Sequence, residues 1–149
     1  MPTYTCACRS GFLDASKKAG IASAITTAHA EVTGAPPYFA QVIFNEVPSG
    51  NHFIGGQKLE HDHIFVFGHI RAGRSAADRK ALIERLTTDV AKGVGVKSFS
   101  VWVYLHELPP AAMVEFGHIL PESGDEAVWA ASLPDDDAAR MQGIGKAAG

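Results

Sequence analysis

Two stretches of the sequence decide the fold: Phe44-Asn45-Glu46-Val47-Pro48 and Leu105-His106-Glu107-Leu108-Pro109. The second stretch repeats the pattern of residue types of the first, apolar-polar-Glu-apolar-Pro, at an offset of 61 residues, from position 44 to position 105. Self-similarity at a fixed offset indicates copies of one supersecondary unit, which bury their apolar faces together. The chain is therefore expected to be built from two equivalent halves.

Outward from these stretches, each half has the order strand, helix, strand. Apolar residues recur every three or four positions in the middle segments and every second position in the flanking ones, which are the periods of helices and strands. The predicted strands are residues 3–9, 40–47, 63–70 and 99–108, and the predicted helices are residues 15–32 and 76–94. Asp14 and Ser75 are expected as N-caps, and Gly34 and Gly95 are expected where the two helices end.

Two such units predict an α+β fold of two layers, in which a tandem β-α-β repeat forms a four-stranded sheet with two helices on one face. We expect a single domain over residues 2–130, made of the repeats 2–61 and 62–122. A C-terminal tail, residues 131–149, is expected to follow it and to be partly disordered.

The sheet face without helices is expected to carry apolar residues, with Ile43, Val66 and Trp102 as candidates. Such a face needs a cover, and in a chain this short the expected cover is another subunit. The fold therefore predicts a closed oligomer.

The tail is acidic at first and then rich in small residues. Residues 134–142 are expected to form one short helix, and the last seven residues are expected to be disordered. We expect Trp129 to anchor the tail to the domain.

The composition is that of a globular protein, because hydrophobic residues make up 46% of the 149 residues and charged residues 19%. A net charge of −3 without runs of Lys or Arg gives no reason to expect nucleic acid or a membrane surface as a partner. No apolar run approaches the roughly 18 residues of a membrane span, and no signal pattern opens the chain. We expect a cytoplasmic protein.

Two groups of residues offer ligands to a metal ion, and neither predicts a metal site. Cys6 and Cys8 point the same way on a strand but stand alone, so reduced and packed thiols are the expected state. His61 and His63 belong to a turn rich in His and Asp, which is more typical of a solvated loop. We expect no metal and no cofactor.

Several short motifs occur at definite places in the repeat: Met1-Pro2, Ile25-Thr26-Thr27-Ala28-His29, Gln41-Val42-Ile43-Phe44-Asn45-Glu46, Gly73-Arg74-Ser75, Val101-Trp102-Val103-Tyr104 and Met113-Val114-Glu115-Phe116-Gly117. Together they resemble the tautomerase superfamily, and within it the cis-3-chloroacrylic acid dehalogenase-like group, over about residues 2–130. The resemblance implies a homotrimer. It also implies six functional residues, which are Pro2, His29, Arg71, Arg74, Tyr104 and Glu115.

The chemistry of the six residue types fits an acid–base site for a small carboxylate. Once Met1 is removed, Pro2 carries a secondary amine of the class that titrates near about pH 8, and a nearby carboxylate would keep it protonated. Arg71 and Arg74 lie three apart between a strand and a helix, where one helical turn would place both on one side as a fork for a carboxylate.

The remaining three residues have roles around that fork. His29 is expected to donate a hydrogen bond to the substrate carboxylate or carbonyl. Glu115 and Tyr104 are expected to hold one water molecule between them, with Glu115 taking its proton.

These roles predict a cofactor-independent enzyme that adds water to a short unsaturated acid, either 3-halo or acetylenic, with broad specificity. Pro2 would deliver a proton to the α-carbon, and the hydrated adduct of a halogenated acid would collapse to an aldehyde acid and halide. One alternative is a keto–enol tautomerase with Pro2 as a neutral base, and another is a non-enzymatic interaction protein on a cytokine-like tautomerase fold. Residues 33–39, which Pro36 and Pro37 stiffen, are expected to shape the pocket without adding a catalytic group. The identity of the physiological substrate therefore stays open.

Overall fold

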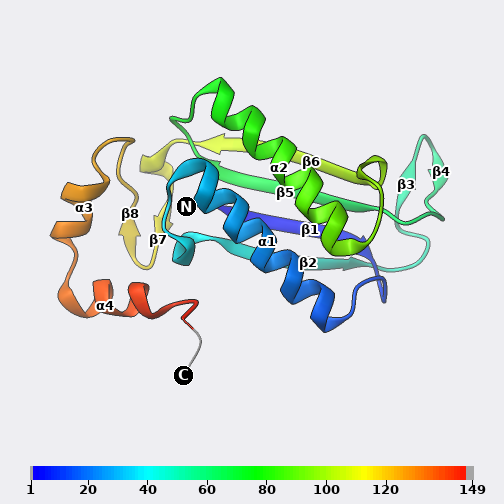
Figure 1. Cartoon of the computed structure of the whole chain (residues 1–149), viewed down its shortest axis with the longest axis horizontal. Helices are drawn as coiled ribbons and strands as arrows, with labels where there is room; N and C mark the ends of the chain where they lie inside the picture. The colour runs from blue at the N-terminus through cyan, green and yellow to red at the C-terminus, as the bar shows by residue number, and fades with distance from the viewer. Residues whose placement is uncertain (1, 147–149) are drawn as a thin grey trace.

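A four-stranded sheet forms one layer of the molecule, and the helices α1 (Ala15–Thr33) and α2 (Ala76–Val94) form the other (Figure 1). The computed structural model describes residues 2–146. The strands are β1 (Thr3–Arg9), β2 (Gln41–Val47), β5 (Ile64–Arg71) and β6 (Val101–Leu108), in the order β2-β1-β5-β6. Each half contributes one parallel pair, and the halves join through the antiparallel pair β1–β5. The predicted tandem repeat is confirmed.

Both helices, α1 and α2, cross the same face of the sheet (Figure 1). The Asp14 side chain accepts a hydrogen bond from the Lys17 N–H at 2.8 Å, and the Ser75 hydroxyl accepts one from the Asp78 N–H at 3.0 Å. Gly34 and Gly95 end the helices with φ of 72° and 85°, in the left-handed region that glycine adopts without strain. The predicted caps are therefore confirmed.

The core lies between the helices and the sheet. Tyr4, Cys6 and Cys8 alternate along β1 toward the helices, and the apolar faces of α1 and α2 pack on them. Val66, expected on the other face of the sheet, is instead fully buried in this core. The reason is that β5 is apolar on both faces, so alternation alone does not distinguish them.

The face of the sheet away from the helices is left uncovered within one chain. Ile43 and Trp102 lie on it with exposures of 41% and 44%, as expected, and Tyr104 is 54% exposed. Phe65 and Phe67 alternate with the core residues of β5, so they belong to this face too.

Short elements close the two ends of the sheet. A hairpin of β3 (Phe53–Ile54) and β4 (Gln57–Lys58) lies at one end, and a hairpin of β7 (Val114–Glu115) and β8 (His118–Ile119) lies at the other (Figure 1). Three single turns of 3₁₀ helix occur as connectors: η1 (Pro37–Phe39), η2 (Ser98–Ser100) and η3 (Pro110–Ala112).

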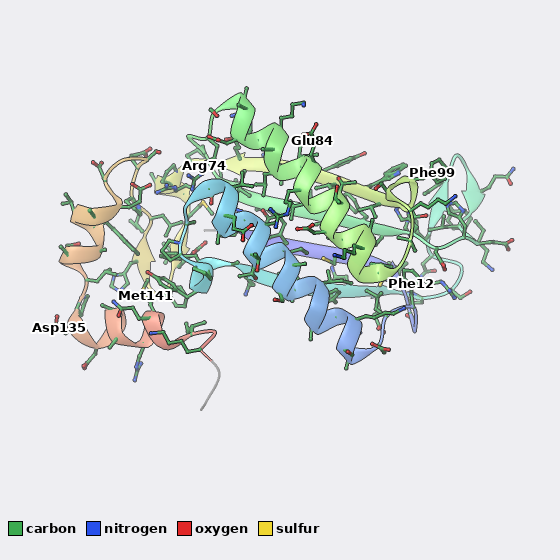
Figure 2. All side chains as sticks on the ribbon, in the orientation of Figure 1. Phe12, Arg74, Glu84, Phe99, Asp135 and Met141 are labelled. Atoms are coloured by element: carbon green, nitrogen blue, oxygen red, sulfur yellow. The ribbon has the colours of Figure 1, made fainter. Side chains whose placement is uncertain are left out.

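The C-terminal segment forms α3 (Glu126–Ser132) and α4 (Asp135–Gly143) beside the β7–β8 hairpin (Figure 1). A second apolar cluster joins it to the domain. In this cluster Met141 of α4, which Figure 2 labels, is buried together with Phe39, Met113 and Leu120. Trp129 packs on this cluster and donates a hydrogen bond to the Ile119 carbonyl at 2.8 Å, so it anchors the segment as expected.

The short helix predicted in the tail is confirmed. Of the seven final residues expected to be disordered, Gly143 ends α4 and Ile144 lines a cavity, whereas residues 147–149 lie outside the described part of the chain. No helix in the described residues is long and apolar enough to cross a membrane.

Candidate active site

Pro2 lies at the start of β1, and its ring is fully buried. Its carbonyl accepts a hydrogen bond from the Gln41 N–H at 2.9 Å, which fixes it against the start of β2. Since residues alternate along a strand, Pro2 is directed to the helix side of the sheet, as Tyr4 is. The antiparallel register pairs Thr3 with His69, so Pro2 lies at the end of the sheet where β5 reaches Arg71.

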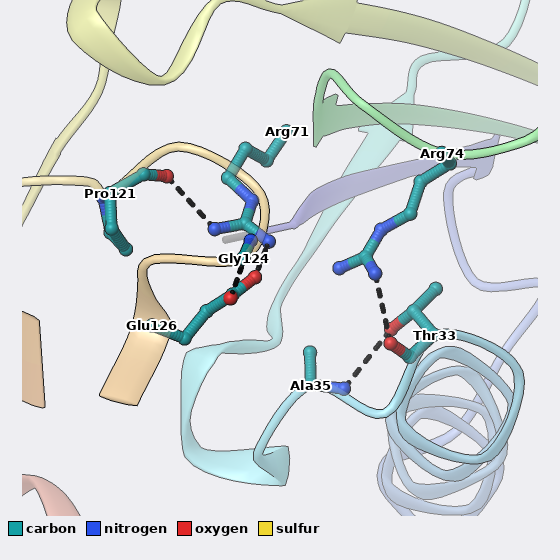
Figure 3. Close-up of polar contacts among 7 residues, drawn as sticks. All are labelled: Thr33, Ala35, Arg71, Arg74, Pro121, Gly124 and Glu126. Carbon is teal, nitrogen blue, oxygen red and sulfur yellow. Dashed lines mark hydrogen bonds and ion pairs between the residues drawn. The ribbon is translucent and has the colours of Figure 1, made fainter. Parts of the chain in front are cut away.

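Arg71 is the last residue of β5, and its side chain is only 1% exposed. A buried guanidinium group needs partners, and Arg71 has two: Nη1 donates to the Pro121 carbonyl at 2.9 Å, and Nη2 donates to the Glu126 carboxylate (Figure 3). The Nε atom is buried without a partner among the described residues. The Nε–H of Arg71 is therefore among the donors left for a ligand.

Arg74 lies in the turn before α2, and its Nη1 donates to the Thr33 carbonyl at 2.9 Å (Figure 3). Burial lowers the pKa of Arg74, and the nearby charge of Arg71 lowers it further. The two arginines line a cavity of about 400 Å³ together with Thr33 and Glu126. The expectation that one helical turn pairs them is wrong, because Arg71 ends a strand and Gly73, with φ of 104°, turns the chain between them.

His29 lies on α1 and is 97% buried, since its exposure is 3%. Its Nδ1 lies 2.8 Å from the Tyr4 hydroxyl, and its Nε2 is buried without a partner among residues 2–146. Burial and the charge of Arg74 lower the pKa of His29 to about 3, so its ring is neutral at neutral pH. With Tyr4 donating to Nδ1, the ring hydrogen is on Nε2, which is then a free donor.

Glu115 lies on β7 at the same end of the sheet but in a second cavity. This cavity measures about 790 Å³ and also contains Thr3, Gln41 and His69. Because Thr3 and Gln41 flank the start of β1 and β2, the cavity adjoins the strand that begins after Pro2. The rest of its lining is mainly apolar: Tyr38, Phe39, Ala40, Leu108, Ala112, Met113, Val114, Phe116 and Ile144.

Tyr104 lies apart from the other five residues within one chain. It is paired with Phe67 in the middle of β6, on the uncovered face, and packs edge-on against Phe65 with ring centroids 5.1 Å apart. The structure thus places Pro2, the two arginines and Glu115 at one end of the sheet, and His29 close enough to Arg74 for that charge to lower its pKa. A water molecule held between Glu115 and Tyr104 of the same chain is not consistent with this arrangement.

Two side chains of the site were not predicted from the sequence, those of Tyr4 and Glu126. Tyr4 carried a weak signal, since its hydroxyl falls on the apolar side of β1 and there needs a partner. Glu126 carried none, because it contacts Arg71 across 55 positions of sequence.

No group of three or more His, Cys, Asp or Glu side chains within the described chain is arranged to hold a metal ion. Cys6 and Cys8 are free thiols buried in the core. His63, expected in a solvated turn, is instead buried and packs edge-on against Trp102 with ring centroids 5.4 Å apart.

Comparison with known proteins identifies the family of the chain. The family model described as "Putative oxalocrotonate tautomerase enzyme" matches residues 1–132. The chain belongs to the tautomerase superfamily. It is 34% identical to a member of the cis-3-chloroacrylic acid dehalogenase family, with a TM-score of 0.92 over 95% of this chain and 99% of that one.

Two further solved structures are similar to this chain at lower identity. A protein inactivated by 2-oxo-3-pentynoate is 27% identical over 79% of this chain and 94% of that chain, with a TM-score of 0.72. A protein described as a fused 4-OT asymmetric trimer is 24% identical over 78% of this chain and 94% of that chain, with a TM-score of 0.73, and shows the fold alone. Comparison with curated protein sequences finds no match.

Proposed function

We propose that this superfamily member is a cofactor-independent hydratase and dehalogenase of short unsaturated carboxylic acids. The observation that carries the proposal is a cavity lined by Arg71 and Arg74 at the end of the sheet where the buried Pro2 begins β1, with the neutral His29 near Arg74. Such a cavity suits a small anion. The proposal requires removal of Met1, because only then does Pro2 carry a titratable amine.

The substrate carboxylate binds in the arginine cavity. Arg71 through Nε and Arg74 through its remaining N–H groups provide charge-assisted donors. The Nε2–H of His29 adds a neutral donor, and together these groups draw electron density away from the β-carbon of the acid. The double bond extends from there toward Glu115.

Water adds across the double or triple bond in two balanced transfers. Glu115 takes a proton from water as the oxygen bonds to the β-carbon, and the protonated Pro2 amine gives a proton to the α-carbon. With a 3-halo acid, the product carries hydroxyl and halide on one carbon. It releases halide and a proton to give an aldehyde acid. An acetylenic acid gives an enol, which tautomerises to the keto or aldehyde acid.

A homotrimer is part of the proposal, because the uncovered face carries Tyr104 away from the other site residues of its own chain. When a second copy covers that face, the site that Tyr104 can reach is the site of the neighbouring subunit. A solved structure of the same fold is described as a trimer, which supports closed assembly as the way this fold covers its sheet.

Keto–enol tautomerisation is the second candidate, and the burial of Pro2 favours it. Burial disfavours the charged form of an amine, so a buried amine is neutral and acts as a base, and Glu115 lines a separate cavity. The two candidates differ in the pKa of Pro2: a raised value supports water addition and a depressed value supports tautomerisation.

The test is a proton NMR assay with cis-3-haloacrylate, propiolate and phenylenolpyruvate on the wild type and on Pro2→Ala. Consumption of the first two acids, lost in Pro2→Ala, supports the proposal, and turnover of phenylenolpyruvate alone supports the tautomerase. Pro134→Ala, at an exposed helix cap, is the matched control and is expected to behave as wild type. Activity that survives unchanged in Pro2→Ala contradicts both enzymes, and a wild type that turns over none of the three acids favours the interaction protein.

A further inference from the structure

The arginine cavity contains a carboxylate of the protein itself. Glu126, the first residue of α3, accepts a hydrogen bond from Arg71 Nη2 through Oε1 and one from the Gly124 N–H at 2.8 Å through Oε2 (Figure 3). The hydrogen bond from Arg71 lowers the pKa of the Glu126 carboxyl, so Glu126 is ionised at neutral pH. Its side chain is 42% exposed, whereas that of Arg71 is 1% exposed.

Ionised side chains give the cavity a net charge of +1. Arg71 and Arg74 contribute two positive charges and Glu126 one negative charge. One substrate carboxylate brings the sum to zero. A second carboxylate on the same ligand brings it to −1, next to the charge of Glu126, and like charges in a partly desolvated site repel each other.

The hydrogen-bond donors lead to the same conclusion. Two of the donor nitrogens of Arg71 are used by Pro121 and Glu126, and one of Arg74 by Thr33. Arg71 Nε and the rest of the Arg74 fork remain, which matches the two oxygens of one carboxylate. Glu126 occupies the position on Arg71 that a second ligand carboxylate needs.

We infer that Glu126 is a specificity-determining residue that restricts the arginine pair to ligands with a single carboxylate. The inference rests on the proposed function, since it takes the arginine cavity as the site of the substrate carboxylate. It adds a property that the proposed reaction does not require, namely discrimination against dicarboxylic acids.

The experiment compares butyrate with succinate, which has a second carboxylate where butyrate has a methyl group. Both are saturated, so neither accepts water, and their dissociation constants are measured by isothermal titration calorimetry on the full chain. The wild type is expected to bind butyrate more tightly. In Glu126→Gln, which keeps the shape and an acceptor but loses the charge, the preference is expected to shift toward succinate by about tenfold.

Two further variants separate charge from structure. Glu126→Asp keeps the charge and is expected to keep the wild-type preference. Glu122→Gln removes an exposed acid four positions earlier in the same segment and is expected to change nothing. Thermal unfolding of each variant establishes that it is folded before its binding is compared.

Three results overturn the inference: wild type that binds succinate as tightly as butyrate, a folded Glu126→Gln with an unchanged preference, or Glu126→Asp that behaves as Glu126→Gln. If Glu126→Gln does not fold, the wild type and Glu126→Asp still decide. Failure of the proposed function is distinguishable, because it is a loss of turnover with unsaturated acids, whereas this readout is a ratio of binding constants for saturated ones.

Discussion

The Tyr4 hydroxyl lies 2.8 Å from Nδ1 of His29, and both side chains are buried between the sheet and α1. The rings meet edge to face, with centroids 5.8 Å apart. Burial raises the pKa of Tyr4 and lowers that of His29, so both groups are neutral at neutral pH. The pair therefore sets which nitrogen of His29 carries the hydrogen, and through it whether His29 donates to a ligand.

Removing the Tyr4 hydroxyl is expected to disturb the His29 tautomer while keeping the core packed. In Tyr4→Phe the ring volume stays, Nδ1 loses its donor, and the free energy of unfolding is expected to fall by about 1 kcal/mol. Nitrogen NMR of the imidazole is expected to show the Nε2–H form in the wild type and a mixture in the variant, with kcat/KM lowered about tenfold. An unchanged tautomer in the variant contradicts the role of Tyr4.

Gly68 provides the space that Tyr4 occupies. A Cβ atom at Gly68 would lie 2.5 Å from Tyr4 Cε1 and 2.9 Å from Leu105 Cδ2, and both neighbours are held in place by packing. Gly68→Ala is therefore expected to lower the free energy of unfolding by about 1–3 kcal/mol, measured by urea denaturation. Gly20→Ala is the control: it lies in α1 with nothing within 4 Å of the new Cβ, so it is expected to raise stability by about 0.5–1 kcal/mol.

The ends of most strands and helices could be predicted to within two residues. For the two helices the reason is that the caps at Asp14 and Ser75 and the glycines at Gly34 and Gly95 are local signals. The assignment of Val66 to the uncovered face failed for a physical reason. Both faces of β5 are apolar, so the pattern holds no information on which side the helices lie.

The site was only partly predictable, since its contacts join distant parts of the chain. Arg71 and Arg74 could be named from the sequence, but the carboxylate on Arg71 comes from Glu126, 55 positions away. No periodicity links these two positions. Tyr104 could be named too, yet its distance from its own chain's site depends on the sheet face it occupies, which sequence alone does not give.

His29 is expected to make stability depend on pH in a defined direction. Its pKa is about 3 in the folded protein and 6.5 in the reference state, so between these values the unfolded chain binds more protons than the folded one. Its contribution is complete above about pH 6.5 and is lost as the pH falls toward 3, by at most about 1.4 kcal/mol per pH unit.

The measurement is urea denaturation of the wild type and His29→Gln between pH 7 and pH 5. The wild type is expected to lose more stability over this range than the variant, because glutamine does not titrate. Parallel curves for the two proteins would show that His29 is not held neutral by its surroundings.

The uncovered sheet face is expected to hold the oligomer together, and one charge in its middle tests this. Trp102 is 44% exposed and lies on the same face of β6 as Tyr104. Trp102→Lys therefore places an ammonium group where apolar side chains meet. Analytical ultracentrifugation is expected to show a trimer for the wild type and a monomer for Trp102→Lys. Val128→Lys, 74% exposed on α3, is the control and is expected to leave the trimer intact. If Trp102→Lys sediments as the wild type does, the subunits associate through another surface, and Tyr104 is then not delivered to a neighbouring site.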